Sequence, residues 1–205
     1  MKIVLLAPPG AGKGTQGHRL AEHFGARHIA TGDLLRAEIR RDSPLGGQVA
    51  TLVARGDLVA DDLVLEVMIP VVRDAVRTGG YVLDGFPRTL PQAQAAYEAA
   101  KDIGAVADVV VYLNVGQAEL VRRLLARAQV QGRADDTAEV IGHRLAVYAQ
   151  ATRPLLDYYA DRGLVLEIDG EGAVDAVNAE MVRRLSDVVP SATTVPMRKD
   201  ARKPS

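Results

Sequence analysis

The segment LLAPPGAGKGTQ, residues 5–16, combines a lysine with three alternating glycines directly after an apolar run. Gly10, Gly12 and Gly14 let the backbone approach an anion without a Cβ in the way. Backbone N–H groups at a helix N-terminus, together with the Lys13 ammonium, can then bind the phosphates of a nucleotide. We therefore interpret the segment as a phosphate-binding loop rather than a glycine-rich turn that happens to carry a lysine.

The loop departs at two positions from the usual pattern of a glycine, four residues and then Gly-Lys-Ser/Thr. Residue 7 is alanine where the first glycine belongs, and Gly14 follows Lys13, so that the hydroxyl comes one place later at Thr15. Alanine fits if its φ is negative, because a methyl group costs little there. We therefore expect a negative φ at Ala7 and a Thr15 hydroxyl that can meet Mg²⁺.

A carboxylate and an arginine follow another apolar run, in VLDGFPR at residues 82–88. Asp84 ends that run, where such folds place the carboxylate that holds Mg²⁺ or its waters. Arg88 comes four residues later, after Pro87, and its planar guanidinium suits a phosphate. An aspartate after a strand is often only a turn or a cap, so this motif supports the loop and would not stand alone.

Four arginines, Arg123, Arg127, Arg133 and Arg144, form a third group. Arg123 and Arg127 are four residues apart and therefore share one helix face. Between residues 120 and 134 every charged side chain is an arginine, whereas a solvated helix face usually mixes the two signs. We favour a role in neutralising phosphate charge over a solvated basic face.

Four apolar runs rich in β-branched residues indicate the strands that would position these groups. They span about residues 3–7, 81–86, 108–115 and 164–169, and RHIA at 27–30 is a candidate for a fifth, shorter strand. Helices are expected between them, at about 13–24, 31–41, 45–55, 61–78, 90–102, 117–127, 137–160 and 172–188. Strands that are apolar throughout and alternate with helices predict an α/β fold, a parallel sheet with helices on both faces. Because such a sheet binds ligands at the carboxyl ends of its strands, the motifs above should meet there.

Two predictions concern single helices. Pro70, inside the helix expected at 61–78, should kink or split it, because proline lacks an N–H and clashes with the preceding turn. Asp136, with Glu139 three residues later, should cap the helix expected from 137 in the manner of a capping box.

Composition narrows the function classes. The 205 residues suit one domain, and a net charge of −1 argues against a nucleic-acid binder that works by bulk electrostatics. The chain has no cysteine, which excludes disulfides and thiolate-bound zinc, and its four histidines share no metal spacing. It begins with KIVLLA and has no run of membrane length, so we expect a cytoplasmic protein without membrane partners. The Pro-containing basic segment 191–205 is expected to be a disordered tail.

With the loop, TGDLLR at 31–36, DGFPR at 84–88 and the spaced arginines together, the chain resembles the adenylate kinase family of nucleoside-monophosphate kinases. The resemblance runs from Lys2 to about Val189 and implies a P-loop domain over 1–190 with a five-stranded parallel core. It further implies an AMP-binding insertion at about 30–59 and a short lid at about 127–137, without structural zinc. The implied reaction is the reversible, Mg²⁺-dependent transfer of a phosphoryl group from ATP to AMP, giving two ADP. A monomer active in adenine-nucleotide homeostasis and salvage, with no nucleic-acid partner, is expected.

The resemblance also assigns residue roles. The ATP-binding set would be Gly10, Ala11, Gly12, Lys13, Gly14, Thr15, Arg123, Arg127 and the backbone of Gly172. The AMP-binding set would be Thr31, Arg36, the backbone of Asp57, Leu58 and Val59, then Gly85, Phe86, Pro87, Arg88, Gln92, Arg133 and Arg144. The catalytic set would be Lys13, Arg88, Arg127, Arg133 and Arg144. Asp84 and Thr15 would hold Mg²⁺ through water, and Asp135 and Asp136 are weaker candidates for contacts that close the lid.

Two alternatives remain open at this point. A uridylate/cytidylate kinase shares the loop and the lid arginines, although Thr31 before Gly32, together with Gln92, favours adenine. A nucleotide-sensing module that transfers no phosphate should have lost some of the catalytic cations, and all are present.

Overall fold

Five parallel strands form the central sheet of the computed structural model, which describes residues 1–131 and 137–188, with only the backbone for 129–131. The strands are β1 (Lys2–Leu6), β2 (Arg27–Ala30), β3 (Tyr81–Asp84), β4 (Val109–Asn114) and β5 (Val165–Asp169). Their order across the sheet is β2-β3-β1-β4-β5, and every neighbouring pair is parallel. The predicted α/β fold with a five-stranded parallel sheet is confirmed.

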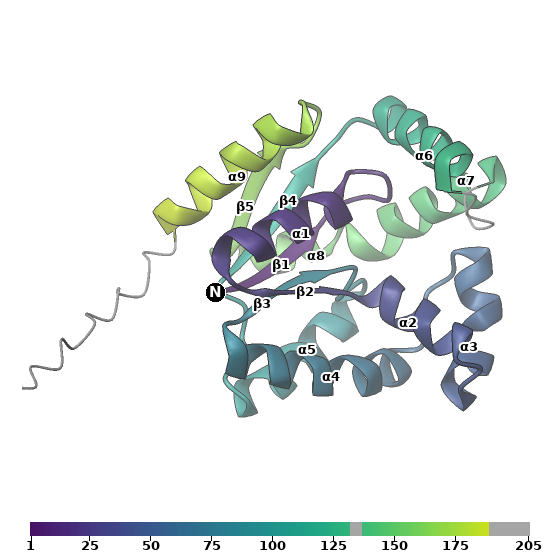
Figure 1. The fold of residues 1–205 in the computed structure, drawn as a ribbon, viewed down its shortest axis with the longest axis horizontal. Coiled ribbons are helices and arrows are strands. Elements are labelled where there is room, and N and C mark those ends of the chain that lie inside the picture. Colours follow the sequence, from purple (N-terminus) through teal and green to yellow (C-terminus); the bar gives the residue numbers. More distant parts are fainter. Residues whose placement is uncertain (132–136, 189–205) are drawn as a thin grey trace, which may run out of the picture.

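Ten helical segments surround the sheet (Figure 1) among the described residues. They are α1 (Lys13–Phe24), α2 (Thr31–Arg40), α3 (Pro44–Arg55), α4 (Asp61–Thr78), α5 (Leu90–Asp102), α6 (Gln117–Gln131), α7 (Ala138–Val147), the π-helical turn η1 (Tyr148–Thr152), α8 (Leu155–Ala160) and α9 (Val174–Val188). In Figure 1, α2 and α3 lie beyond the end of the sheet rather than on a face. None of the helices in 1–131 and 137–188 combines the length and apolarity that a membrane span needs.

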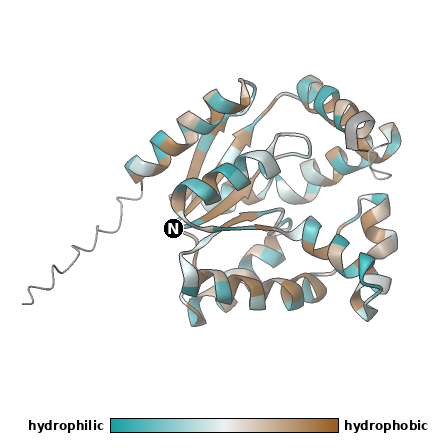
Figure 2. Cartoon of the chain, in the orientation of Figure 1, coloured by the Kyte–Doolittle hydropathy of each residue, from teal (hydrophilic) through white to brown (hydrophobic). Residues whose placement is uncertain are grey.

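Two apolar clusters cover the two faces of the sheet. Ile3 and Leu5 of β1 belong to the cluster that contains the buried residues of α1 and α9. Val4 and Leu6 point the other way, into the cluster built by α4, α5 and α8. This alternation follows from the two-residue period of a strand, and Figure 2 shows brown stretches within the strands. Burial on both faces holds β1 rigidly, and β1 ends at the glycine-rich loop.

The register of the sheet brings three sequence motifs to one edge. Leu5 of β1 is paired with Asp84 of β3, and Ala30 of β2 is paired with the same residue. The loop after β1, the start of α2 and the segment after Asp84 therefore leave the sheet side by side. This is the juxtaposition expected from the carboxyl ends of parallel strands.

Two predictions about helices are wrong, and a third is wrong in one of its two alternatives. The helix expected at 137–160 is divided into α7, η1 and α8 by the π-helical turn. Thr137, not Asp136, caps α7, since its hydroxyl accepts a hydrogen bond from the Val140 N–H at 3.3 Å. Pro70 does not split its helix, because α4 is continuous; Pro70 is exposed, so water can reach the carbonyl that loses its partner. The alternative, a kink at Pro70, stays a prediction.

Candidate active site

The glycine-rich loop joins β1 to α1 with two residues in the left-handed region. Gly10 has φ 86°, and Gly12, the N-cap of α1, has φ 92°. Gly10 also faces α6, where a Cβ would lie 2.8 Å from the Leu124 Cγ. Among the described non-glycine residues only Asp42 has a positive φ, so the expected negative φ at Ala7 is confirmed. Ala7 is buried in the core, and its methyl group does not disturb the loop.

The Lys13 side chain folds back over this loop. Its ammonium donates to the carbonyl oxygens of Ala7 at 2.9 Å and Pro8 at 3.1 Å. Removal from water lowers the pKa of Lys13 to about 8; the Asp84 carboxylate opposes that change, while Arg88, Arg144 and Arg127 reinforce it. Lys13 and these three arginines therefore repel one another, and the Asp84 carboxylate offsets part of their charge. A bound polyanion would relieve this repulsion.

Two adjoining cavities open at this edge of the sheet. The larger has a volume of about 570 Å³, and the smaller, of about 60 Å³, extends toward α3 and α4. The predicted residues lining the larger are Gly10, Gly12, Lys13, Gly14, Thr15, Arg36, Leu58, Asp84, Gly85, Pro87, Arg88, Arg123, Arg127 and Arg144. Those lining the smaller are Thr31, Arg36, Asp57, Leu58, Val59, Gly85, Arg88, Gln92 and Arg144. Arg36, Arg88 and Arg144 line both, so the cations lie where the two cavities join.

Arg88 is held along its whole backbone. Its N–H donates to the Gln92 Oε1 at 2.7 Å, and its carbonyl accepts from the Thr152 hydroxyl at 2.8 Å. Its own Nε donates to the Gly85 carbonyl at 2.9 Å, and the intervening Phe86–Pro87 peptide bond is cis. Burial, followed by the nearby charge of Arg144, lowers the pKa of Arg88.

The wall of the smaller cavity combines charged and buried polar side chains with apolar ones. Thr31 and Gln92 are both buried, with the Thr31 hydroxyl 3.4 Å from the Met68 sulfur. The Gln92 amide nitrogen donates to Asp61 at 2.7 Å. Arg36, at the cavity junction, is paired with Asp33 at 2.7 Å. Buried polar groups in an apolar pocket can distinguish one flat heterocycle from another.

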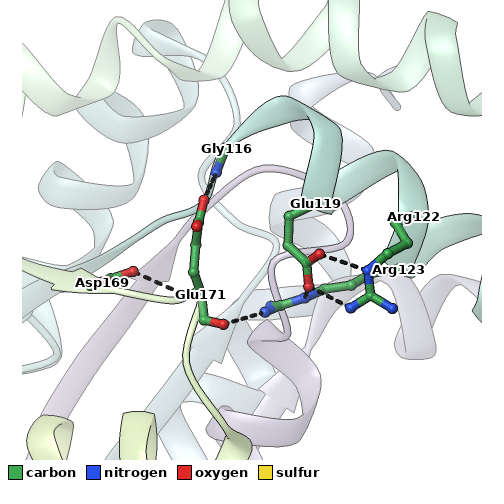
Figure 3. A network of polar contacts seen from close by, with 6 residues as sticks. All are labelled: Gly116, Glu119, Arg122, Arg123, Asp169 and Glu171. Carbon is green, nitrogen blue, oxygen red and sulfur yellow. Dashed lines mark hydrogen bonds and ion pairs between the residues drawn. The ribbon is translucent and has the colours of Figure 1, made fainter.

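Arg123 of α6 and Glu171 tie this helix to the loops that follow β4 and β5 (Figure 3). The contacts of Arg123 stay within α6 and reach the loop after β5. Its Nε donates to Glu119 at 2.6 Å, and its terminal nitrogen donates to the Glu171 carbonyl at 3.4 Å. The Glu171 carboxylate in turn accepts from the Gly116 N–H at 2.7 Å. Hydrogen bonds from Arg122 and then Arg123 lower the pKa of Glu119 to about 2. Glu119, the acidic partner of these arginines, thus lies directly before residues 120–134, the stretch in which every charged side chain is an arginine.

Several predicted site residues do not line the cavities. Ala11 and Phe86 are core residues, although their neighbours face the larger cavity. Gly172 follows Glu171, which Arg123 contacts, but is not itself part of the cavity wall. Arg133, Asp135 and Asp136 lie outside the described residues, as does the rest of 132–136 in the expected lid.

The structure adds three contacts that could not be predicted from the sequence. His143 of α7 lies 2.6 Å from the Asp57 carboxylate, which follows α3. Gly56, with φ 78°, packs so closely on Arg144 that a Cβ would collide with the arginine's aliphatic chain. Thr152 reaches Arg88 across 64 residues of sequence. A lone histidine, a glycine at a helix end and a helical threonine are each too common to signal a site.

A metal ion in this cavity would have oxygen ligands available. Asp84 and Thr15 both line it, and a Cβ on Gly14 would lie 3.8 Å from the Asp84 Oδ2, which places this carboxylate beside the start of α1. Carboxylate, hydroxyl and phosphate oxygens are the donors that Mg²⁺ prefers. Over the described residues, no three or more His, Asp or Glu side chains gather as a protein-only metal site.

Comparison with known proteins identifies the family. A family model described as adenylate kinase matches residues 5–164. The chain belongs to the adenylate kinase family. It is 45% identical over 177 residues to an adenylate kinase of Xanthomonas euvesicatoria pv. vesicatoria, covering 86% of this chain and 95% of the relative. It is 44% identical over 179 residues to an adenylate kinase of Thermus thermophilus, covering 87% and 94%. A relative from Stenotrophomonas maltophilia, also named adenylate kinase, is 44% identical over 182 residues, covering 89% and 97%. The expected class of enzyme, an ATP:AMP phosphotransferase, is thereby confirmed.

Proposed function

We propose that the protein transfers the terminal phosphoryl group of ATP to AMP, reversibly and with Mg²⁺, through the residues of the two adjoining cavities. The observation that carries this assignment is the junction at Arg36, Arg88 and Arg144, since these cations separate a phosphate loop from a pocket with buried polar groups. Two nucleotides bound on either side would bring their phosphates together there.

ATP would bind with its phosphates on the loop of residues 10–15. The N-terminus of α1 and the left-handed glycines present backbone N–H groups to an anion. Lys13 would exchange the carbonyls of Ala7 and Pro8 for phosphate oxygens and follow the charge during transfer. Arg123 and Arg127 would extend the contact along α6, and the Gly172 backbone would border the adenine.

AMP would place its base in the smaller cavity and its phosphate at the junction. Arg36 and Arg88 would grip the α-phosphate, while Thr31, Gln92 and the backbone of residues 57–59 would border the adenine. The insertion at about 30–59 would carry α2 and α3 and close on this nucleotide.

Transfer needs no general base, because the attacking phosphate oxygen of AMP is already anionic. The remaining task is to align two polyanions and neutralise charge on the moving group. Lys13, Arg88, Arg127, Arg133 and Arg144 would do so, and one such cation can contribute roughly 10³–10⁵ in rate. A lid at about 127–137 would exclude water and so prevent hydrolysis of ATP.

Asp84 and Thr15 would hold Mg²⁺ through water beside the loop. The ion would supply positive charge that neutralises part of the negative charge of the phosphates. We further propose a cytoplasmic monomer with ATP and AMP as partners and without nucleic-acid or membrane partners.

Initial rates with ATP and Mg²⁺ and either AMP, UMP or CMP as acceptor test the assignment. The structure of the smaller cavity leads us to expect AMP to be the preferred acceptor. A preference of about tenfold or more for UMP or CMP would assign a pyrimidine kinase instead. Failure to form ADP from ATP and AMP would indicate a nucleotide sensor.

A further inference from the structure

Arg88 differs from its neighbours in the way its backbone is held. Both of its main-chain polar groups are bonded to buried side chains, the N–H to Gln92 and the carbonyl to Thr152. Four polar residues are fully buried among the described ones, Gln16, Thr31, Gln92 and Thr152, so two of the four serve this one backbone unit. Fixing both groups leaves the Arg88 peptide planes little freedom to rotate, which directs the guanidinium into the cavity junction.

The Thr152 hydroxyl comes from an unusual piece of helix. Thr152 ends the π-helical turn η1, in which the Arg153 N–H donates to the Tyr148 carbonyl five residues earlier at 2.9 Å. A threonine in a helix ordinarily bonds the carbonyl three or four residues before it. Thr152 donates instead to Arg88, and its side chain is 5% exposed. Such π-helical turns occur frequently at functional sites.

We infer that Thr152 is a positioning residue for AMP: through the Arg88 carbonyl it fixes the guanidinium that grips the AMP phosphate. This inference rests on the proposed role of Arg88. Thr152 also lines the larger cavity, but its hydroxyl donates to the protein's own backbone, at the Arg88 carbonyl. Without the hydroxyl, the Arg88 carbonyl loses its buried partner, and the loop can turn to find another.

Two comparisons between substitutions at residue 152 separate the effect of the hydroxyl from the effect of side-chain shape. Thr and Val have the same shape, and Ser and Ala differ from each other by the oxygen alone. The variants T152V and T152A therefore remove the hydrogen bond, and T152S keeps it. T78V is the matched control, because Thr78 is an exposed helical threonine whose hydroxyl bonds carbonyls of its own helix.

Steady-state kinetics should be measured for each variant with ATP and AMP varied in turn, together with the Tm. T152V and T152A should raise the KM for AMP about fivefold, the equivalent of one hydrogen bond, and leave the KM for ATP within about twofold. T152S and T78V should keep both values within about twofold of the parent. A purely structural threonine would lower the Tm without separating the two KM values.

The inference is overturned if T152V and T152A leave the KM for AMP unchanged, or raise both KM values equally. It is also overturned if T152S behaves like T152A. Should T152V fail to fold, the comparison of T152S with T152A decides in the same way. The parent protein is assayed first: absence of ADP formation there refutes the proposed function, whereas normal parent activity with an unaffected T152V refutes only this inference.

Discussion

At the scale of single residues, the surroundings of Lys13 suit the binding of an anion. Its ammonium is withdrawn from water, surrounded by arginines and bonded to two carbonyls of its own loop. The phosphate-binding loop around this lysine and the negative φ of Ala7 could be predicted from the sequence, because both depend on local residue spacing and backbone angles. Its lowered pKa could not, since it depends first on burial by the folded chain and then on arginines more than 70 residues away.

Nucleotide binding should therefore take up a proton in mildly alkaline solution. The pKa of Lys13 is about 8 in the free protein, and phosphates beside the ammonium raise it. Below pH 8 Lys13 is protonated in both states, so ATP affinity should not vary on its account. Above pH 8 the free protein has lost the proton that binding restores, and affinity should fall as the pH rises.

Calorimetric titration with ATP at a pH about half a unit above that pKa, in buffers of different ionisation enthalpy, measures this uptake. K13M is the comparison: it should remove the uptake and lower turnover by at least about a hundredfold while keeping the fold. The same proton count in K13M and the parent would show that another group titrates.

Replacing Ala7 with glycine should affect stability more than activity. Glycine accepts the negative φ of this position, so turnover should stay within about twofold. The lost buried methyl group and the freer unfolded chain should lower the free energy of unfolding by about 1 kcal/mol. Thermal unfolding and an activity assay check both halves; a large loss of activity would mean that the methyl group itself shapes the loop.

At the scale of elements, most boundaries could be predicted and one could not. Regular apolar patterns and turn residues at their ends predicted α1, α4 and α5 with the bounds observed. The stretch from 137 to 160 also has a helical pattern, but η1 divides it. In a π-helical turn each N–H bonds the carbonyl five residues earlier instead of four. Here the turn is bonded through Thr152 to Arg88 on a distant loop, and no local sequence pattern reveals that contact.

The end of α3 should be more sensitive than other helix ends. Gly56 is its left-handed C-cap and lies against Arg144, whereas Gly25, the left-handed C-cap of α1, has open space around its missing side chain. G56A and G25A should each lower the free energy of unfolding by about 1–2 kcal/mol, because alanine is strained at a left-handed φ. Only G56A should also displace Arg144 and lower kcat by about tenfold or more. Equal kcat values for the two variants, with both folded, would show that Arg144 can shift away from the new methyl group without loss of activity.

At the scale of the whole molecule, segments from opposite sides of the cavities touch each other. The residues after α3 meet α7 through Asp57 and His143 and through Gly56 and Arg144. The sheet topology places both segments at the same edge, and this much followed from the sequence. Their mutual contact did not, because it depends on how far each projects over the edge.

Replacing His143 with alanine should loosen this contact without touching the phosphate sites. The pair is partly exposed, at 47% and 33% for the two side chains, and such pairs contribute little individually. H143A should raise the KM for AMP by about two- to fivefold, with the KM for ATP unchanged. H23A, at an exposed histidine of α1, is the control and should change neither value. A lower KM for AMP in H143A would show that the contact obstructs AMP binding.

The contact between Gly10 and Leu124 has a mechanical consequence. The phosphate loop packs directly on Leu124, and Arg123 is bonded to Glu171, so the first turns of α6 are attached to the end of the sheet. We therefore expect the proposed lid at about 127–137 to pivot beyond Leu124. Arg123 would remain stationary during such a swing, while Arg127, one turn further, would travel along an arc toward the bound phosphates.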